Sequence, residues 1–121
     1  MNVNQYKEKV IETIIEPMLS FMEYWDDDDE FDYTVEDVET CKALMNHYLD
    51  ALNSMVDPSD DSIMEQVKKL VLALNELNEQ VDYALIETEA RESIWEIIQT
   101  SAIECGLQEY EDDITEEWRE W

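Results

Sequence analysis

Apolar side chains recur every three or four positions along most of the chain, the spacing of one face of an α-helix. The clearest stripes cover residues 38–55 and residues 63–81. Thr34 is placed to cap the first of these two helices, and Asp37 at the third helical position completes a capping box. An Asp-Pro pair at residues 57–58 ends it, because proline disfavours helical conformation in the residue before it. The pattern therefore predicts two long, adjacent amphipathic helices.

Two further helices are predicted on either side of this pair. The first covers residues 4–25 and contains Pro17, which removes a backbone donor and crowds the preceding turn. A kink or a break near this proline is expected. The last helix is expected to start after Thr88, and Gly106, the only glycine, stands where a left-handed C-cap belongs. The pattern leaves open whether residues 79–87 extend the third helix or form a linker.

These segments predict an all-α protein, an antiparallel bundle of four to five amphipathic helices in one domain over residues 1–121. Residues 108–121 are expected to form an acidic C-terminal segment with a short fifth helix at residues 113–120. Docking of that helix onto the bundle would use Ile114 and two tryptophans. Strand alternation of useful length and hairpin turn signals are missing from the sequence.

The composition narrows the partners of such a bundle. Among 121 residues, 33 are Asp or Glu and 7 are Lys or Arg, so the formal net charge is −26, while 45% of residues are apolar. This apolar share separates the chain from disordered acidic tails. Direct binding to nucleic acid or to an anionic membrane is not expected, because both require cationic side chains. No basic start followed by an apolar run opens the chain, which favours a cytoplasmic protein.

Side chains suited to catalysis are sparse. The only histidine, His47, lies between core positions of its helix and lacks the partner glutamate of a di-iron bundle, so a partly buried structural role is expected. Cys41 and Cys105 form no C-x-x-C pair and are expected to be buried thiols. A single glycine excludes Gly-rich phosphate-binding loops. We therefore expect a protein without catalytic residues, without a metal site and without a cofactor.

In two places the spacing of acidic residues resembles known metal-binding patterns. Residues 26–30 carry the first ligand types of an EF-hand loop, but Phe31 stands where that loop needs glycine, so only weak divalent-cation binding is expected there. Separately, Glu36-x-x-Glu39 and Glu79-x-x-Asp82 resemble the acidic motifs of all-α nucleotide pyrophosphohydrolases of the MazG type. In that family paired carboxylates hold Mg²⁺ against nucleotide phosphates. The resemblance implies a Mg²⁺-dependent nucleotide hydrolase, and it covers these two pairs alone.

Negative charge is concentrated in two patches, which supply the candidate partner-binding residues. In residues 26–39, nine of fourteen positions are acidic. These are Asp26, Asp27, Asp28, Asp29, Glu30, Asp32, Glu36, Asp37 and Glu39. The C-terminal candidates are Glu111, Asp112, Asp113, Glu116, Glu117, Trp118 and Trp121. Tryptophan is a frequent anchor in protein interfaces, which is why the last two are included.

The first function hypothesis is a non-enzymatic module that neutralises or inhibits a basic protein partner. In size, charge and architecture the chain looks like bacterial or phage inhibitors, namely toxin immunity proteins and nucleic-acid mimics. Acidic clusters steer cationic surfaces into contact, and −26 equals the charge of about 13 base pairs of duplex. The alternatives are an acidic scaffold or homodimer built on the stripe at residues 38–55 or 63–81, the Mg²⁺-dependent hydrolase, and acidity that serves solubility alone.

Overall fold

The computed structural model describes residues 2–24, 33–107 and 113–121, and the regular structure in these ranges is entirely helical. Four helical rods are formed by these described residues. The elements in chain order are α1 (Val3–Val10), η1 (Ile11–Ile15), α2 (Glu16–Tyr24), α3 (Val35–Ser54), α4 (Asp60–Gln80) and α5 (Thr88–Cys105). The first rod consists of α1, the π-helical turn η1 and α2 without interruption. The prediction of an all-α protein is confirmed.

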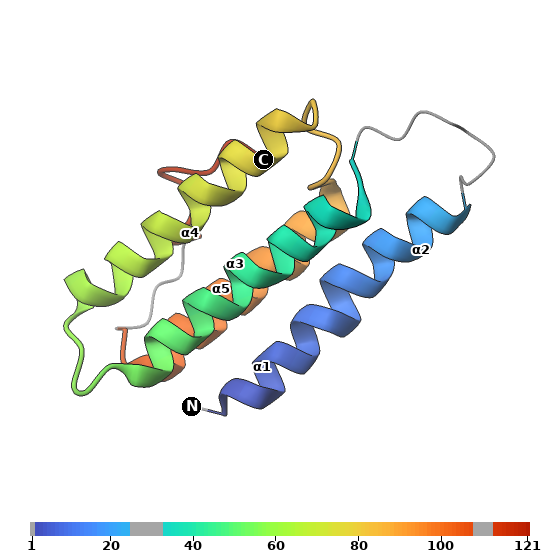
Figure 1. The fold of residues 1–121 in the computed structure, drawn as a ribbon. Coiled ribbons are helices and arrows are strands. Elements are labelled where there is room, and N and C mark those ends of the chain that lie inside the picture. Colours follow the sequence, from blue (N-terminus) through green and yellow to red (C-terminus); the bar gives the residue numbers. More distant parts are fainter. Residues whose placement is uncertain (1, 25–32, 108–112) are drawn as a thin grey trace.

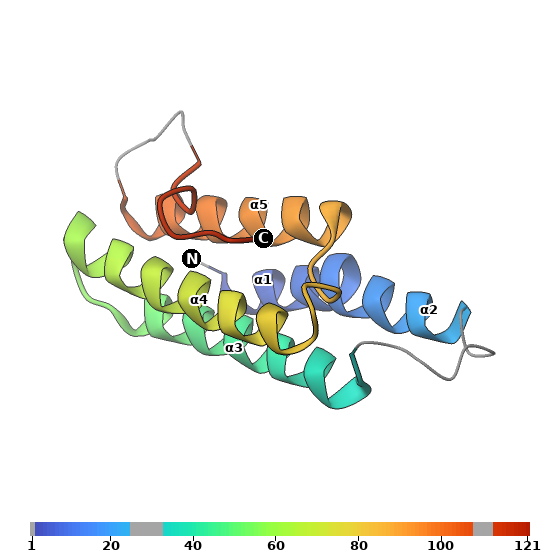
Figure 2. The ribbon, with the colours of Figure 1, turned by 90° about the horizontal axis from the view of Figure 1, so that it is seen from above.

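The four rods run alternately up and down, so each is antiparallel to the next in the chain (Figure 1). The first rod packs against α3 and α5, and α4 packs against the same two helices. Figure 1 shows the first rod and α4 on opposite sides of the molecule, and Figure 2 shows α3 and α5 at opposite edges of the view from above. α3 and α5 also contact each other. This arrangement encloses one core. Among the described helices, none combines the length and the apolar content needed to cross a membrane.

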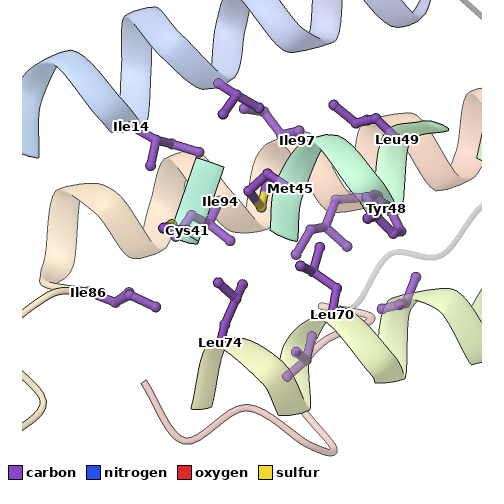
Figure 3. Packing of buried hydrophobic residues seen from close by; sticks show 14 of the residues in the cluster. Ile14, Cys41, Met45, Tyr48, Leu49, Leu70, Leu74, Ile86, Ile94 and Ile97 are labelled. Atoms are coloured by element: carbon purple, nitrogen blue, oxygen red, sulfur yellow. Dashed lines mark hydrogen bonds between the residues drawn. The ribbon is translucent and has the colours of Figure 1, made fainter. Parts of the chain in front are cut away.

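The apolar stripes of the sequence form that core. In Figure 3, Ile14 of the first rod, Met45 of α3, Leu74 of α4 and Ile94 of α5 all point into the same interior. The other buried residues on predicted faces are Val10, Met18, Val38, Cys41, Tyr48, Leu52, Ile63, Val67, Leu70, Leu77, Val81, Ile98 and Ala102. Because the stripes of α3 and α4 are buried within one chain, they are not exposed as faces for a second copy. Phe21 is exposed over 42% of its surface, and Met55 and Cys105, also on predicted stripes, are partly buried.

Local capping residues set the helix ends as predicted. The hydroxyl of Thr34 accepts a bond from the backbone N–H of Asp37, and the Asp37 carboxylate accepts one from the backbone N–H of Thr34 at 2.8 Å. Ser59 caps α4 by its hydroxyl alone, which accepts from the backbone N–H of Ser62 at 3.2 Å. Gly106 ends α5 with a φ of +127°, a value that side-chain-bearing residues rarely adopt.

The helical turn just before Pro17 contains one residue more than an α-helical turn. The N–H of Glu16 donates to the carbonyl of Ile11, five residues back, which is the spacing of a π-turn. The Thr13 hydroxyl donates to the Lys9 carbonyl at 2.6 Å. Proline has no N–H to donate, so the ladder of helical hydrogen bonds lacks one donor at Pro17, directly after this wider turn. The expected kink stays a prediction, because the observed feature is this wider turn.

Residues 81–87 form a compact linker, which settles the alternative left open by the sequence. The N–H of Asp82 donates to the Glu79 carbonyl, and the N–H of Tyr83 donates to the Asn78 carbonyl at 2.7 Å. This pair of bonds defines a Schellman cap. The Asn78 side-chain oxygen then accepts from the N–H of Ile86 at 3.0 Å, and Ile86 is buried. The linker is therefore fixed to the end of α4.

Asp82 occupies the position of this cap that glycine normally fills, with a φ of +54°. Replacing it by glycine should stabilise the protein by about 1 kcal/mol, because glycine carries no Cβ penalty in the left-handed region. Urea unfolding would measure this gain. The control is Asp82→Ala, which removes the same charge but keeps the strain. Equal midpoints for the two variants would show that charge, and not backbone conformation, governs this position.

Residues 113–121 form a C-terminal strap, and here the prediction of a short helix at residues 113–120 is wrong. The strap consists of hydrogen-bonded turns, such as Trp118 N–H to Thr115 carbonyl at 3.2 Å. Two contacts explain the difference. The Asp113 carboxylate accepts from the Thr115 N–H at 2.8 Å, and Asn75 of α4 binds both the Trp118 carbonyl and the Glu120 N–H. The last of these contacts occupies the Glu120 N–H, which in a continuing helix would bond to the Glu116 carbonyl four residues back.

Candidate functional site

A groove of about 410 Å³ lies between η1–α2 and the first half of α5. Its walls and floor include Ile14, Met18, Phe21, Tyr33 and Leu85, of which all but Phe21 are buried. The Tyr33 hydroxyl donates to the Met18 carbonyl at 3.4 Å and ties the start of the α3 segment to α2. Tyr33 and Leu85 close the core at this end, which leaves Phe21 at the edge of the groove. The groove thus has an apolar floor.

Exposed carboxylates rim this apolar floor along one side. Glu87, Glu89, Glu92 and Glu96 all line the groove and are all exposed. Burial and the nearby negative charge of Glu87 together raise the pKa of Tyr33. Opposite these carboxylates, the first rod contributes uncharged side chains, among them Thr13. The groove therefore combines an apolar contact area with a strongly negative edge.

Two further hollows continue the groove along the contact between the first rod and α5. A hollow of about 180 Å³ shares Thr13 and Glu96 with the groove. A third hollow, of about 400 Å³, shares Tyr6 and Lys9 with the second. We call the acidic lining of all three the acidic seam. Its members are Glu8, Glu12, Glu87, Glu89, Glu92, Glu96 and Glu104. Among the described lining residues, Lys9 is the one basic side chain.

The acidic seam is held at its far end by a hydrogen bond between the two helices. The Tyr6 hydroxyl of α1 donates to the Glu104 carboxylate of α5. Burial, followed by this bond and the charge of Glu104, raises the pKa of Tyr6, so the phenol stays protonated and keeps donating. From Glu87 to Glu104 the seam follows α5 for about 26 Å, at about 1.5 Å of rise per residue.

The groove end of the acidic seam opens onto exposed aromatic side chains. Phe21 and Tyr83, 42% and 57% exposed, line a hollow of about 620 Å³ together with Ile86. Glu87, Glu89 and Arg91 surround them. Exposed aromatic side chains beside a charged edge are typical of protein-binding surfaces.

The first acidic patch predicted from the sequence is only partly within the described residues. Asp26, Asp27, Asp28, Asp29, Glu30 and Asp32 lie outside them, and so does the EF-hand-like spacing. Glu36 and Glu39 are exposed at the start of α3, whereas Asp37 is engaged in the capping box. A partner-binding role for this patch stays a prediction.

The C-terminal candidates lie mainly within the strap, away from the acidic seam. Glu111 and Asp112 lie outside the described residues, Asp113 forms an ion pair with Arg119, and Glu116 and Glu117 are exposed. Trp118 and Trp121 pack against the core. The ring centroid of Trp118 is 6.0 Å from the Lys68 ammonium, and Arg119 stacks over Trp121 at 5.5 Å. Both rings are thus engaged within the chain, and their role as partner anchors stays a prediction.

The residues considered for chemistry do not converge. His47 is exposed and not partly buried as expected, Cys41 is buried and Cys105 is half-buried, and both cysteines are free thiols. In the described part of the chain, no three His, Cys, Asp or Glu side chains gather as a metal site would require. The MazG-like pairs at residues 36–39 and 79–82 therefore do not form such a group.

Sequence reasoning missed the acidic seam, although part of its signal was present. Glu8 and Glu12 are four positions apart, and Glu89, Glu92 and Glu96 recur at steps of three and four, so each set follows one helix face. Local charge density drew attention to residues 26–39 instead. No protein-family model matches the chain, and no curated protein or solved structure matches it either.

Proposed function

We propose that this protein is a non-enzymatic binding module that neutralises a basic protein partner, and that the acidic seam with its groove is the contact surface. The observation that carries the proposal is the joining of an apolar groove to seven carboxylates that are accompanied by one lysine. Such a surface attracts a cationic protein over a distance and discriminates against acidic ones. The proposed partners are those of toxin immunity proteins and nucleic-acid mimics, namely nucleases and DNA-binding proteins.

The apolar floor favours a protein-specific contact over simple charge imitation. A row of carboxylates alone would be enough to imitate phosphates. The groove adds an apolar area near Phe21 where a side chain of the partner could be buried away from water. Buried anchors of this kind supply most of the binding energy in protein interfaces. The proposal therefore combines electrostatic attraction with one apolar anchor.

A panel of basic nucleases and DNA-binding proteins tests this proposal. At least one member should bind with an affinity that falls as salt is raised, because salt screens exposed charges. Replacing Glu92 and Glu96 together by glutamine should weaken that binding about tenfold, since two surface ion pairs contribute about 1.4 kcal/mol in total. Isothermal titration calorimetry at three salt concentrations gives both results.

The matched control removes two charges elsewhere. Asp61→Asn with Glu76→Gln changes the net charge equally on α4, which packs against α3 and α5. That double variant should change the affinity less than twofold. A parallel variant at Glu116 and Glu117 tests the strap. The proposal fails if no member of the panel shows salt-sensitive binding, or if all three double variants weaken it equally.

A further inference from the structure

We infer that the groove receives an amphipathic basic helix of the partner, lying lengthwise along the acidic seam with one bulky apolar residue beside Phe21. This inference rests on the proposed function and specifies its partner. The groove and the two hollows that continue it together form a trough. This trough follows α5 for about 26 Å, which a helix of about 17 residues would match. Docking of an amphipathic helix into a groove is a common mode of peptide recognition.

The backbone around the trough favours a helix over an extended segment. An extended chain gains much of its affinity by pairing with the free backbone groups of a sheet edge. Most of the walls of this trough come from α1, η1, α2 and α5, whose backbone groups bond within their own helices, while Tyr33, Leu85 and Glu87 close its α2 end. The described residues contain no strand. A helical ligand satisfies its own backbone and needs none from the wall.

The placement of charge predicts the sequence pattern of the ligand. Glu8 and Glu12 stand on the first rod, and Glu92, Glu96 and Glu104 stand on α5, so both walls carry carboxylates. Lysine or arginine at steps of three and four along the flank that meets α5 would face carboxylates over the whole trough. Cations on the other flank would meet Glu8 and Glu12 at the α1 end only, because the first rod is uncharged beside the groove. The ligand should therefore carry an apolar face with cations along one border and, toward one end, along the other.

The two ends of the trough differ, which places the anchor. At the α2 end the lining includes Ile14, Met18, Phe21 and Leu85. The hollow at the other end is lined by polar and charged residues together with the Tyr6 ring. A bulky apolar side chain gains from leaving water only at the first of these ends. The anchor is thus expected near one end of the ligand helix.

Three synthetic peptides of 18 residues test the inference with the full chain, followed by fluorescence anisotropy at low and moderate salt. The first is helix-forming, with a leucine and tryptophan stripe between lysines. The second has the same composition with the apolar residues scattered, and the third contains two central prolines. The first should bind at least tenfold more tightly than the others. Phe21→Ala should weaken it about fivefold, whereas Leu72→Ala, at a residue of similar exposure on α4, should leave it unchanged.

The outcomes separate this inference from the proposed function. Equal binding of the three peptides would overturn the helical ligand and leave the basic protein partner standing. Binding of a basic protein from the panel without binding of the helical peptide would also overturn it. If neither peptides nor basic proteins bind, both proposals fail. Circular dichroism of Phe21→Ala checks that the variant is folded, as expected for a substitution at a partly exposed position.

Discussion

Raising the pH above 9 is expected to destabilise this protein by about 1.4 kcal/mol per pH unit for each buried acid that is held protonated. Cys41 is fully buried, and burial raises its pKa from an ordinary 9.0 to about 12. In the unfolded chain the thiol loses its proton near pH 9, while the folded chain keeps it. The unfolded state then binds fewer protons, so its share grows as the pH rises from 9 to 12.

Tyr48 should extend this effect. Its hydroxyl donates to the Ile98 carbonyl at 3.0 Å and lies 3.2 Å from the Ser101 hydroxyl, and burial raises its pKa. Urea unfolding at pH 7, 9, 10 and 11 measures the combined loss. Over this range Cys41→Ala should also lose stability, but its loss per pH unit should be about 1.4 kcal/mol smaller than that of the unmodified chain. Cys105→Ala is the comparison at the half-buried cysteine, whose pKa burial also raises, so this variant should flatten the loss to a smaller extent than Cys41→Ala. Parallel losses in Cys41→Ala and the unmodified chain would contradict the assignment.

Replacing Asn75 by alanine is expected to cost about 2–3 kcal/mol and to release the C-terminal strap. Asn75 is buried, its amide donates to the Trp118 carbonyl at 2.7 Å, and its oxygen accepts from the Glu120 N–H at 3.0 Å. Each bond contributes about 1 kcal/mol, and the strap groups left behind must find water. Chymotrypsin should then cleave at Trp118 faster than in the unmodified chain, and urea unfolding gives the energy.

Asn46 provides the matched control for this substitution. Its side-chain oxygen is buried and has no hydrogen-bond partner in the described structure. Asn46→Ala therefore loses no bond from that oxygen and should cost less than 1 kcal/mol, with unchanged cleavage at Trp118. If both variants lose the same stability, the two bonds to the strap contribute nothing beyond side-chain packing.

Local rules were enough to predict the helices. The stripe from Val38 to Leu52 and the capping box at Thr34 and Asp37 depend on residues a few positions apart, and these are present in the structure. The conformation of the strap was predicted wrongly because it involves contacts with residues far away in the sequence. Residues 113–121 are held as a strap by Asn75, more than forty positions away in the chain. No periodicity within the strap itself reveals that contact.

The candidate site follows the same division between local and distant contacts. The steps of Glu8 to Glu12 and of Glu92 to Glu96 can be read from the sequence, because each lies on one helix. That the two helices face each other depends on the antiparallel packing of the first rod against α5. The density of charge along the chain depends only on residues that are neighbours in sequence. It therefore identified residues 26–39 and the strap, and missed a surface built from two distant segments.

The π-turn before Pro17 sets the rotational phase of the whole first rod. Tyr6, Val10, Ile14 and Met18 follow one another at steps of four, which would wind about 120° around an uninterrupted α-helix. One extra residue in a turn takes back about 100° of that winding, so the four side chains stay aimed at the core. A single-residue deletion in η1 would turn α2 by about 100° relative to α1, carrying Phe21 away from the groove while Tyr6 keeps its bond to Glu104.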